Sequence, residues 1–278
     1  MKHSTRYIAG GAVRYAPVAD GTSFDGHLLS EYNIVVEKIV DRLPDVREEL
    51  AENNGRHGSS VRSLRMMPRD ISLECRLFTS MVTVADKDGD MGDWYDYDGA
   101  MSFVASCLYT DTDRELVLRN HPGQYYMAHF KSVDEGDRDD QSAGFTLNFV
   151  ASDPLRYETY ERVLVVQRST TAQFDVGGSD EAKLRIEVSG VSNSRAFVYM
   201  YHQETGSKYA LALYGKADTS VVTYDCVNHV ATLGTYGAED ARRTGLYMGS
   251  QWPVLMPGRW TVQSESGTAT LTWRQSWR

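Results

Sequence analysis

The sequence predicts a mainly β protein with two domains, an α+β N-terminal domain and a C-terminal β-sandwich. Apolar and polar residues alternate along much of the chain, which is typical of strands that place one face on a core. Convincing helical spacing occurs in one segment, residues 97–109. Tyr (17 residues) and Gly (23) are frequent and Pro is rare (7), a composition that suits strands and tight turns.

The first domain, residues 1–160, combines strands with one clear helix. A strand-like pattern begins the chain at 7–15, and a weak helical pattern follows Pro44 over 45–52. In 71–77 every odd-numbered residue is apolar, and 145–151 repeats that alternation, so both segments are predicted strands. Between them, one face of the predicted helix carries Met101, Val104, Ala105 and Leu108.

A change of pattern around 153–168 marks the predicted domain boundary. Asp153-Pro154 is expected to end a strand, because Pro donates no hydrogen bond to a ladder. A polar stretch follows at 157–162, and the apolar run 163–166 comes next. We therefore place the boundary between residues 160 and 161.

Residues 161–278 are predicted to form the β-sandwich. Strand patterns recur there about every 8–12 residues, with glycine turns between them. The predicted apolar faces of three of these strands are Leu184, Ile186 and Val188, then Phe197, Tyr199 and Tyr201, then Tyr209, Leu211 and Leu213.

Charge and composition exclude several classes of protein. The formal net charge is −9, and the 29 basic residues form no run of the kind that binds nucleic acid. No apolar stretch approaches the roughly 20 residues that span a bilayer, so we expect no membrane insertion and synthesis in a cytoplasm. The three cysteines, Cys75, Cys107 and Cys226, are far apart, which supports neither a disulfide framework nor a zinc site.

Catalytic motifs are absent from the sequence. The seven histidines show no HxH or HExxH spacing, and there is neither a Gly-x-Ser-x-Gly elbow nor a glycine-rich phosphate loop followed by Lys. We therefore predict no catalytic residues, no cofactor and no enzymatic activity. A glycoside hydrolase remains an alternative, because its two carboxylates can come from distant positions among the 38 acidic residues.

One acidic segment resembles the start of a calcium loop. Asp86, Asp88 and Asp90 alternate as cation ligands do, but Met91 stands where the loop needs Gly and Tyr97 where it needs Glu. We predict no metal site and interpret this segment as a solvated turn, with cation binding by the three aspartates as the alternative.

The aromatic residues near the C-terminus allow two interpretations. Trp252 and Trp260, with Trp273 and Trp277, fit the core of a sandwich. The alternative is that Trp252 and Trp260 contact a glycan on the surface of the C-terminal domain.

Three landmarks in the sequence carry a family resemblance. The first is Asn54-Gly55-Arg56-His57-Gly58-Ser59, together with residues 68–75 that follow it. The second is the segment 144–157, which includes Asp153-Pro154-Leu155-Arg156-Tyr157. The third is the segment 252–262, which includes Pro257-Gly258. Their order and spacing resemble the distal tail protein family of siphophages, also called the siphovirus tail component family. The resemblance covers about residues 50–278.

The resemblance implies a structural virion protein with a galectin-like C-terminal sandwich. It implies a homohexameric ring at the tail tip, which joins the tail tube protein to tail hub or fibre proteins and is assembled in the host cytoplasm. DNA would pass through without specific binding, and an acidic lumen would repel its phosphates. Gly55, Arg56, Gly58 and Arg69 are the candidate subunit or partner contacts. The alternative function is a carbohydrate-binding adhesion module that recognises host cell-wall glycans.

Overall fold

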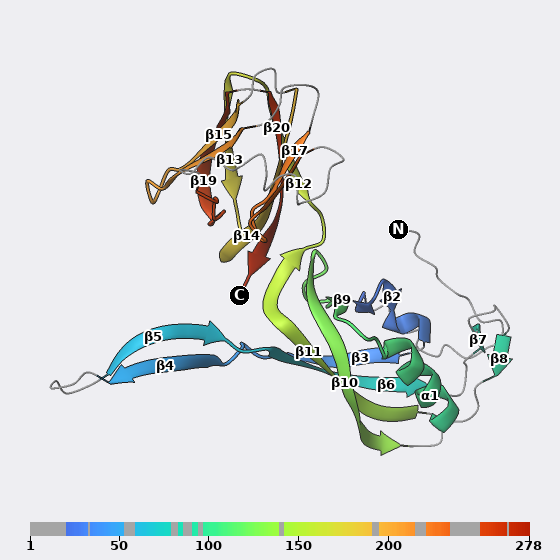
Figure 1. Ribbon diagram of the computed structural model, residues 1–278. Helices are drawn as coiled ribbons and strands as arrows, with labels where there is room; N and C mark the ends of the chain where they lie inside the picture. The colour runs from blue at the N-terminus through green and yellow to red at the C-terminus, as the bar shows by residue number, and fades with distance from the viewer. Residues whose placement is uncertain are drawn as a thin grey trace. The chain divides into compact units, whose positions relative to one another are not determined.

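The computed structural model describes residues 21–32, 34–52, 59–78, 83–85, 91–93, 97–138, 142–190, 195–214, 221–233, 251–265 and 267–278. The chain divides into two compact units, Met1–Pro154 and Leu155–Arg278. Strands make up most of the described chain, as the sequence predicts (Figure 1). The division follows Pro154, whereas the sequence placed the boundary after Tyr160.

The elements of the first unit are β1 (Ser23–Phe24), β2 (His27–Leu28), the 3-10 helix η1 (Leu29–Tyr32), β3 (Ile34–Asp41), β4 (Val46–Glu52), β5 (Ser59–Met66), β6 (Arg69–Phe78), β7 (Thr83–Ala85), β8 (Met91–Asp93), α1 (Tyr97–Leu108), β9 (Arg114–Val117), β10 (Gln124–Arg138) and the greater part of β11 (Ser142–Glu158). Seven strands form one sheet in the order β3-β6-β11-β10-β9-β1-β2. The pairs β4–β5 and β7–β8 form separate two-stranded sheets.

The two strands predicted most clearly in the first unit lie side by side. Strands β6 and β11 pair antiparallel from Ser142 opposite Phe78 to Ala151 opposite Arg69. This register places Phe149 opposite Ile71, so both apolar faces enter one core. Phe149 also contacts the ring of Phe24, at 5.2 Å between ring centroids.

Helix α1 begins at Tyr97 and ends at Leu108, within the predicted segment 97–109. Val104 and Leu108 are buried, and Met101 packs against the same cluster. The predicted apolar face of the helix is therefore the face that packs on the core of the first unit.

Strand β11 does not end at Asp153-Pro154 as predicted, but continues to Glu158. Its pairing with β6 stops at Ala151, and its pairing with β20 (Thr268–Trp277) begins at Arg156. The proline lies between these two ladders, where its missing N–H breaks no hydrogen bond of either ladder.

The second unit is a β-sandwich, as predicted. Its further strands are β12 (Arg162–Val166), β13 (Thr170–Val176), β14 (Asp180–Ser189), β15 (Arg195–His202), β16 (Lys208–Tyr214), β17 (Val222–Asp225), β18 (Val230–Leu233), β19 (Gly258–Ser264) and β20. One sheet has the order β18-β17-β14-β20, with β12 pairing the far side of β20, and the other has the order β13-β19-β15-β16.

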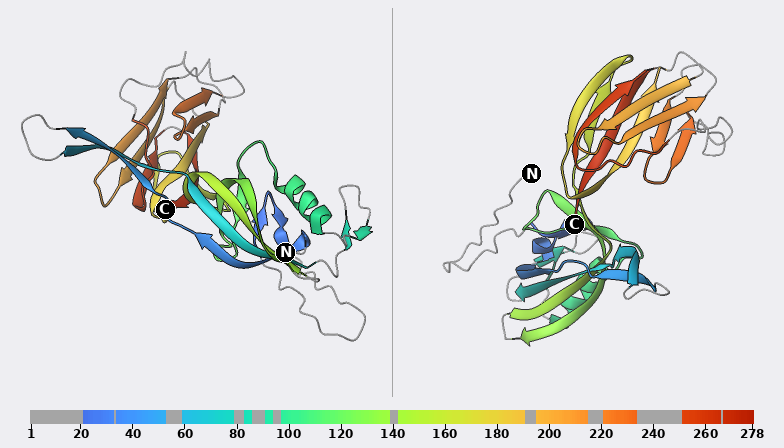
Figure 2. Two further views of the ribbon diagram at one scale, coloured as in Figure 1. Left: turned by 90° about the horizontal axis from the view of Figure 1, so that it is seen from below. Right: turned by 90° about the vertical axis from the view of Figure 1, so that its left-hand side faces the viewer.

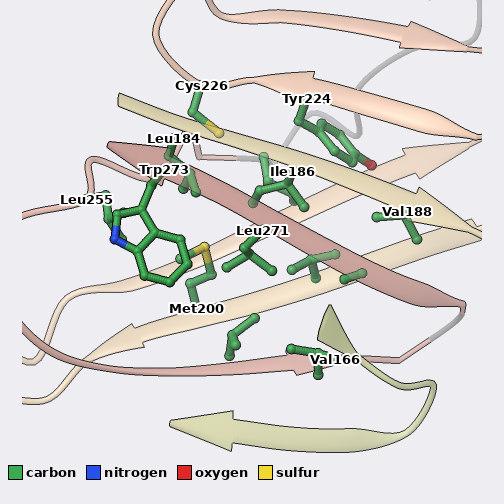
Figure 3. Close-up of a cluster of buried hydrophobic side chains, with 14 of the residues drawn as sticks. Val166, Leu184, Ile186, Val188, Met200, Tyr224, Cys226, Leu255, Leu271 and Trp273 are labelled. Atoms are coloured by element: carbon green, nitrogen blue, oxygen red, sulfur yellow. The ribbon is translucent and has the colours of Figure 1, made fainter. Parts of the chain in front are cut away.

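The core of the second unit lies between these two sheets. Figure 3 shows Leu184 and Ile186 of β14, Leu271 of β20 and Met200 of β15 pointing into the same space. The predicted inward face of β14 is confirmed, because Leu184, Ile186 and Val188 are buried.

Strand β15 faces the opposite way to the prediction. Val198 and Met200 are buried, whereas Tyr199 and Tyr201 point outward. Both faces of β15 carry apolar side chains, so the alternation identifies the strand but does not decide which face meets the core.

Candidate assembly interface

The hairpin of β4 and β5, with its connections at 42–45 and 67–68, is an exposed part of the first unit. We call residues 42–68 the arm. Figures 1 and 2 show its two strands running together away from the other strands of that unit. No residue of 42–50 or 61–68 is buried. A two-stranded hairpin without further packing is marginally stable in water.

The sequence predicted a helix over 45–52, and this prediction is wrong. Val46–Glu52 forms strand β4, which pairs with β5 from Val46 opposite Met66 to Glu52 opposite Ser59. Glu, Leu and Ala favour helices when the chain is isolated, but the cross-strand hydrogen bonds with β5 override that preference. Val46 and Leu50 are four residues apart with Glu48 between them, a spacing that fits one face of a helix as well as one face of a strand, so the segment by itself carried no clear signal for a strand.

One face of the arm is apolar apart from Glu48. The register places Val46 opposite Met66, Glu48 opposite Leu64 and Leu50 opposite Val61 on this face. Val46, Leu50, Val61 and Leu64 are each more than half exposed. The strands therefore present a row of aliphatic side chains to solvent, which is the property of a surface that another protein covers.

The opposite face of the arm is polar and charged. Arg47 stands opposite Arg65, and Glu49 stands opposite Ser63, whose hydroxyl donates to Glu49 Oε2 at 3.1 Å. Like charges directly opposite each other destabilise a strand pair, so Arg47 and Arg65 add nothing to the stability of the isolated hairpin.

The root of the arm is held by a buried polar cluster, which we call the root clamp and which consists of Asp41, Arg69 and Tyr126. Asp41 ends β3 and Arg69 begins β6, so the clamp joins the two strands between which the arm is inserted. Arg69 Nε lies 3.6 Å from Asp41 Oδ1, and their side chains are 2% and 14% exposed.

Tyr126 of β10 completes the root clamp. Its hydroxyl accepts a hydrogen bond from Arg69 Nη1 and donates one to Asp41 Oδ2 at 2.7 Å. The guanidinium carbon of Arg69 also lies 5.2 Å from the centroid of the Tyr126 ring. The clamp therefore fixes the direction in which the chain leaves the core and returns to it.

The structure separates the predicted contact residues. Arg69 lies in the root clamp, where its side chain is buried within its own unit. Gly55, Arg56 and Gly58 belong to the segment 53–58, which connects β4 to β5 and lies outside the described residues. Asp86, Asp88 and Asp90, the candidate cation ligands, also lie outside them. Within the described ranges no group of three or more His, Cys, Asp or Glu residues could hold a metal ion.

Of the two tryptophans considered for glycan contact, Trp260 belongs to the core of the second unit and Trp252 packs against that core. Trp260 is fully buried, and its Nε1 donates a hydrogen bond to the Met256 carbonyl at 2.8 Å. Trp252 is half-buried against the core cluster, with its ring 5.3 Å from the His229 ring. The Trp260 ring is therefore closed to any ligand in this fold.

The largest pKa shifts belong to buried groups. Burial, with a smaller contribution from Asp225, raises the pKa of the Cys226 thiol to about 12, so it is protonated at neutral pH. Burial likewise raises the pKa of Tyr224, which lies in the same core. Both shifts follow from the packing of a sandwich core.

No described helix has both the length and the hydropathy needed to cross a membrane.

Comparison with known proteins relates the chain to phage tails. Residues 24–151 match the family model of the phage tail protein RIFT-related domain. The distal tail protein of Bacillus phage SPP1 is 23% identical over 237 residues, which cover 84% of this chain and 86% of that protein. These matches confirm the resemblance predicted from the sequence.

One solved structure shows the same fold. The crystal structure of the SPP1 Dit protein, described as a paradigm of the hub adsorption apparatus, matches with a TM-score of 0.71 and 18% identity. The match covers 92% of this chain and 98% of that chain. The baseplate of phage P2 in its activated conformation with Ca gives a TM-score of 0.42 at 9% identity, over 87% of this chain and 90% of that chain.

Proposed function

We propose that this chain forms a homohexameric ring at the distal end of a siphophage tail, on the premise that residues 24–151 match the model of the phage tail protein RIFT-related domain. The ring would join the tail tube protein to tail hub or fibre proteins. The similarity to a distal tail protein supports a structural role in the virion, for which no catalytic residue is needed.

The apolar face of the arm is the observation that carries the proposal. A head-to-tail contact that repeats around a closing rotation gives a ring, and each copy then supplies one arm and one receiving surface. Each aliphatic side chain that becomes fully buried contributes about 1.5–3 kcal/mol. The exposed side chains Val46, Leu50, Val61 and Leu64 can therefore supply a substantial part of the association free energy.

The ring would leave a channel for DNA, and the charge of the chain supports that part of the proposal. Each copy carries a formal charge of −9. Acidic side chains around a lumen repel the phosphates of DNA, so DNA passes without binding to the wall of the channel. A structure of the assembled ring with a basic lumen would overturn this part of the proposal.

The arm is tested by measuring the mass of the chain in solution, together with electron microscopy. We expect the wild type to form rings, either alone or with tail partners. The double variant Leu50→Ser/Leu64→Ser removes apolar area from the arm and is expected to be monomeric, with the core of the first unit intact.

The matched control changes the opposite face of the arm. Arg47→Ser/Arg65→Ser alters the same two strands but leaves the apolar face unchanged, and this variant is expected to form rings as the wild type does. A wild type that stays monomeric even with tail partners would refute the ring. Rings of normal stability from the Leu50→Ser/Leu64→Ser variant would refute the role of the arm.

A further inference from the structure

Aromatic side chains form a row on the outer face of one sheet of the second unit. On β15, Val198 and Met200 point into the core, whereas Phe197, Tyr199 and Tyr201 alternate with them and point outward. Tyr199 is 40% exposed and Tyr201 is 37% exposed. The rings of Phe197 and Tyr199 lie 6.0 Å apart between centroids and are nearly parallel, with 3° between their planes.

The neighbours of Tyr201 are polar. The strand register places Thr261 of β19 on one side of Tyr201 and Lys208 of β16 on the other, with Gln173 of β13 beyond Thr261. Lys208 Nζ lies 5.7 Å from the centroid of the Tyr201 ring. Thr261 Oγ1 accepts a hydrogen bond from Gln203 Nε2 at 3.2 Å.

The neighbours of Tyr199 are polar on one side and small on the other. Gln263 lies opposite Tyr199 on β19, with Thr171 beyond it on β13, and Ala210 lies opposite on β16. Because Ala210 ends in a methyl group, no long side chain from that position covers the ring. We call Phe197, Tyr199 and Tyr201 with these flanking side chains the aromatic row.

The charged side chains around the aromatic row are already engaged within the same face. Arg259 Nε lies 3.0 Å from Asp175 Oδ1. Glu265 Oε2 accepts a hydrogen bond from the Tyr199 hydroxyl at 3.2 Å. Among the side chains that the structure describes on this face, the basic Lys208 and Arg259 are matched by the acidic Asp175 and Glu265, and the polar neighbours named above are amides and hydroxyls. The ligand complementary to such a face is uncharged.

We propose that the aromatic row of β15 binds an uncharged oligosaccharide along the strand. The faces of aromatic rings pack against the apolar C–H faces of pyranose rings, while side-chain amides and hydroxyls exchange hydrogen bonds with sugar hydroxyls. Two exposed rings that follow one strand suit an extended chain, such as a β-1,4-linked glycan, whose successive rings lie in line.

This site differs from the one considered in the sequence. Trp260 lies beneath the sheet, in the core, whereas the exposed rings belong to β15. The site lies wholly within the second unit and does not depend on the arm, so it goes beyond the proposed ring. Its failure would leave the ring proposal untouched.

The experiment titrates the full chain with two probes by calorimetry, the hexasaccharides of β-1,4-linked glucose and of β-1,4-linked N-acetylglucosamine. We expect at least one probe to bind. The variant Tyr199→Ala/Tyr201→Ala removes both exposed rings and is expected to bind about tenfold more weakly or worse. Tyr199→Phe/Tyr201→Phe keeps the rings and is expected to retain most of the affinity.

Tyr109→Ala is the matched control, because Tyr109 is an exposed tyrosine of the first unit and β15 belongs to the second unit. It is expected to bind the probe as the wild type does. Thermal unfolding of each variant checks that the sandwich remains folded.

Three results would overturn the proposal. The first is that neither hexasaccharide binds the wild type at low millimolar concentration. The second is that Tyr199→Ala/Tyr201→Ala binds as tightly as the wild type. The third is that this variant changes the mass of the assembly, which would show that the aromatic row packs against a second copy of the chain.

Discussion

Replacing Asp41 by alanine tests whether the root clamp holds the arm. In the structure Asp41 is the carboxylate partner of Arg69, and it also accepts the hydrogen bond of the Tyr126 hydroxyl. The Asp41→Ala variant leaves the Arg69 guanidinium buried, with Tyr126 as its remaining partner in the clamp.

The expected cost follows from the burial of the pair. Removing one partner of a buried ion pair costs about 3–5 kcal/mol, because the other charge stays buried without compensation. Asp41 is partly exposed and Arg69 keeps Tyr126, so we expect the low end of this range, about 3 kcal/mol. The assay is urea unfolding of the full chain, monitored with a signal that reports on the first unit.

Two further variants separate the clamp from general damage. Tyr126→Phe removes only the hydroxyl between the two charges and is expected to cost about 1.5–3 kcal/mol. Asp41→Leu/Arg69→Met replaces both charges with apolar groups and is expected to recover most of the stability lost in Asp41→Ala. Since Asp41 and Tyr126 share one hydrogen-bond network, the loss of unfolding free energy in the variant that combines Asp41→Ala and Tyr126→Phe is expected to differ from the sum of the two single losses.

A free energy of unfolding of Asp41→Ala within about 1 kcal/mol of the wild-type value would refute the role of the root clamp. That role is also refuted if the effects of Asp41→Ala and Tyr126→Phe add, because the two residues would then act independently. Ring formation provides a second readout, since a loosened root should weaken assembly although the apolar face of the arm is unchanged.

Two predictions concern the second unit. Trp260→Ala leaves a cavity in the core and an unpaired Met256 carbonyl, and it should lower the free energy of unfolding by about 3–5 kcal/mol in denaturant titration; a loss below about 1 kcal/mol would contradict the burial of this ring. Burial opposes ionisation of Glu158, but the hydrogen bonds from Arg162, at 2.8 and 3.0 Å, and from Tyr160 hold the pKa of Glu158 below its ordinary value. Its stabilisation is therefore present above the unfolded pKa, about 4.3, and is lost as pH falls through the lower folded pKa; Glu158→Gln should reduce the acid sensitivity of unfolding, and an unchanged pH profile would show that the pair contributes nothing.

The sequence predicted well wherever one face of an element is apolar and the other polar. The alternation in 71–77 and 145–151 identified β6 and β11, and the spacing of Met101, Val104 and Leu108 identified the packed face of α1. It also predicted the sandwich of the second unit from the repeated short strands.

The predictions that failed depended on partners distant in sequence. Residues 45–52 have helical propensity, and only pairing with 59–66 makes them a strand. Pro154 does not end β11, because the strand changes its partner there. The partners that Arg69 has within the chain could not be found in the sequence either, since Asp41 and Tyr126 reach it from two other strands.

The sequence by itself determined the mainly β class and the resemblance to phage tail proteins, because periodicity and local motifs are properties of short segments. The tertiary structure alone decided which apolar residues are buried. On β15 both faces are apolar, and packing placed Val198 in the core and Tyr199 outside. Trp260 is likewise hidden, and the arm leaves Leu50 and Leu64 exposed, because burial depends on what the rest of the chain places against each side chain.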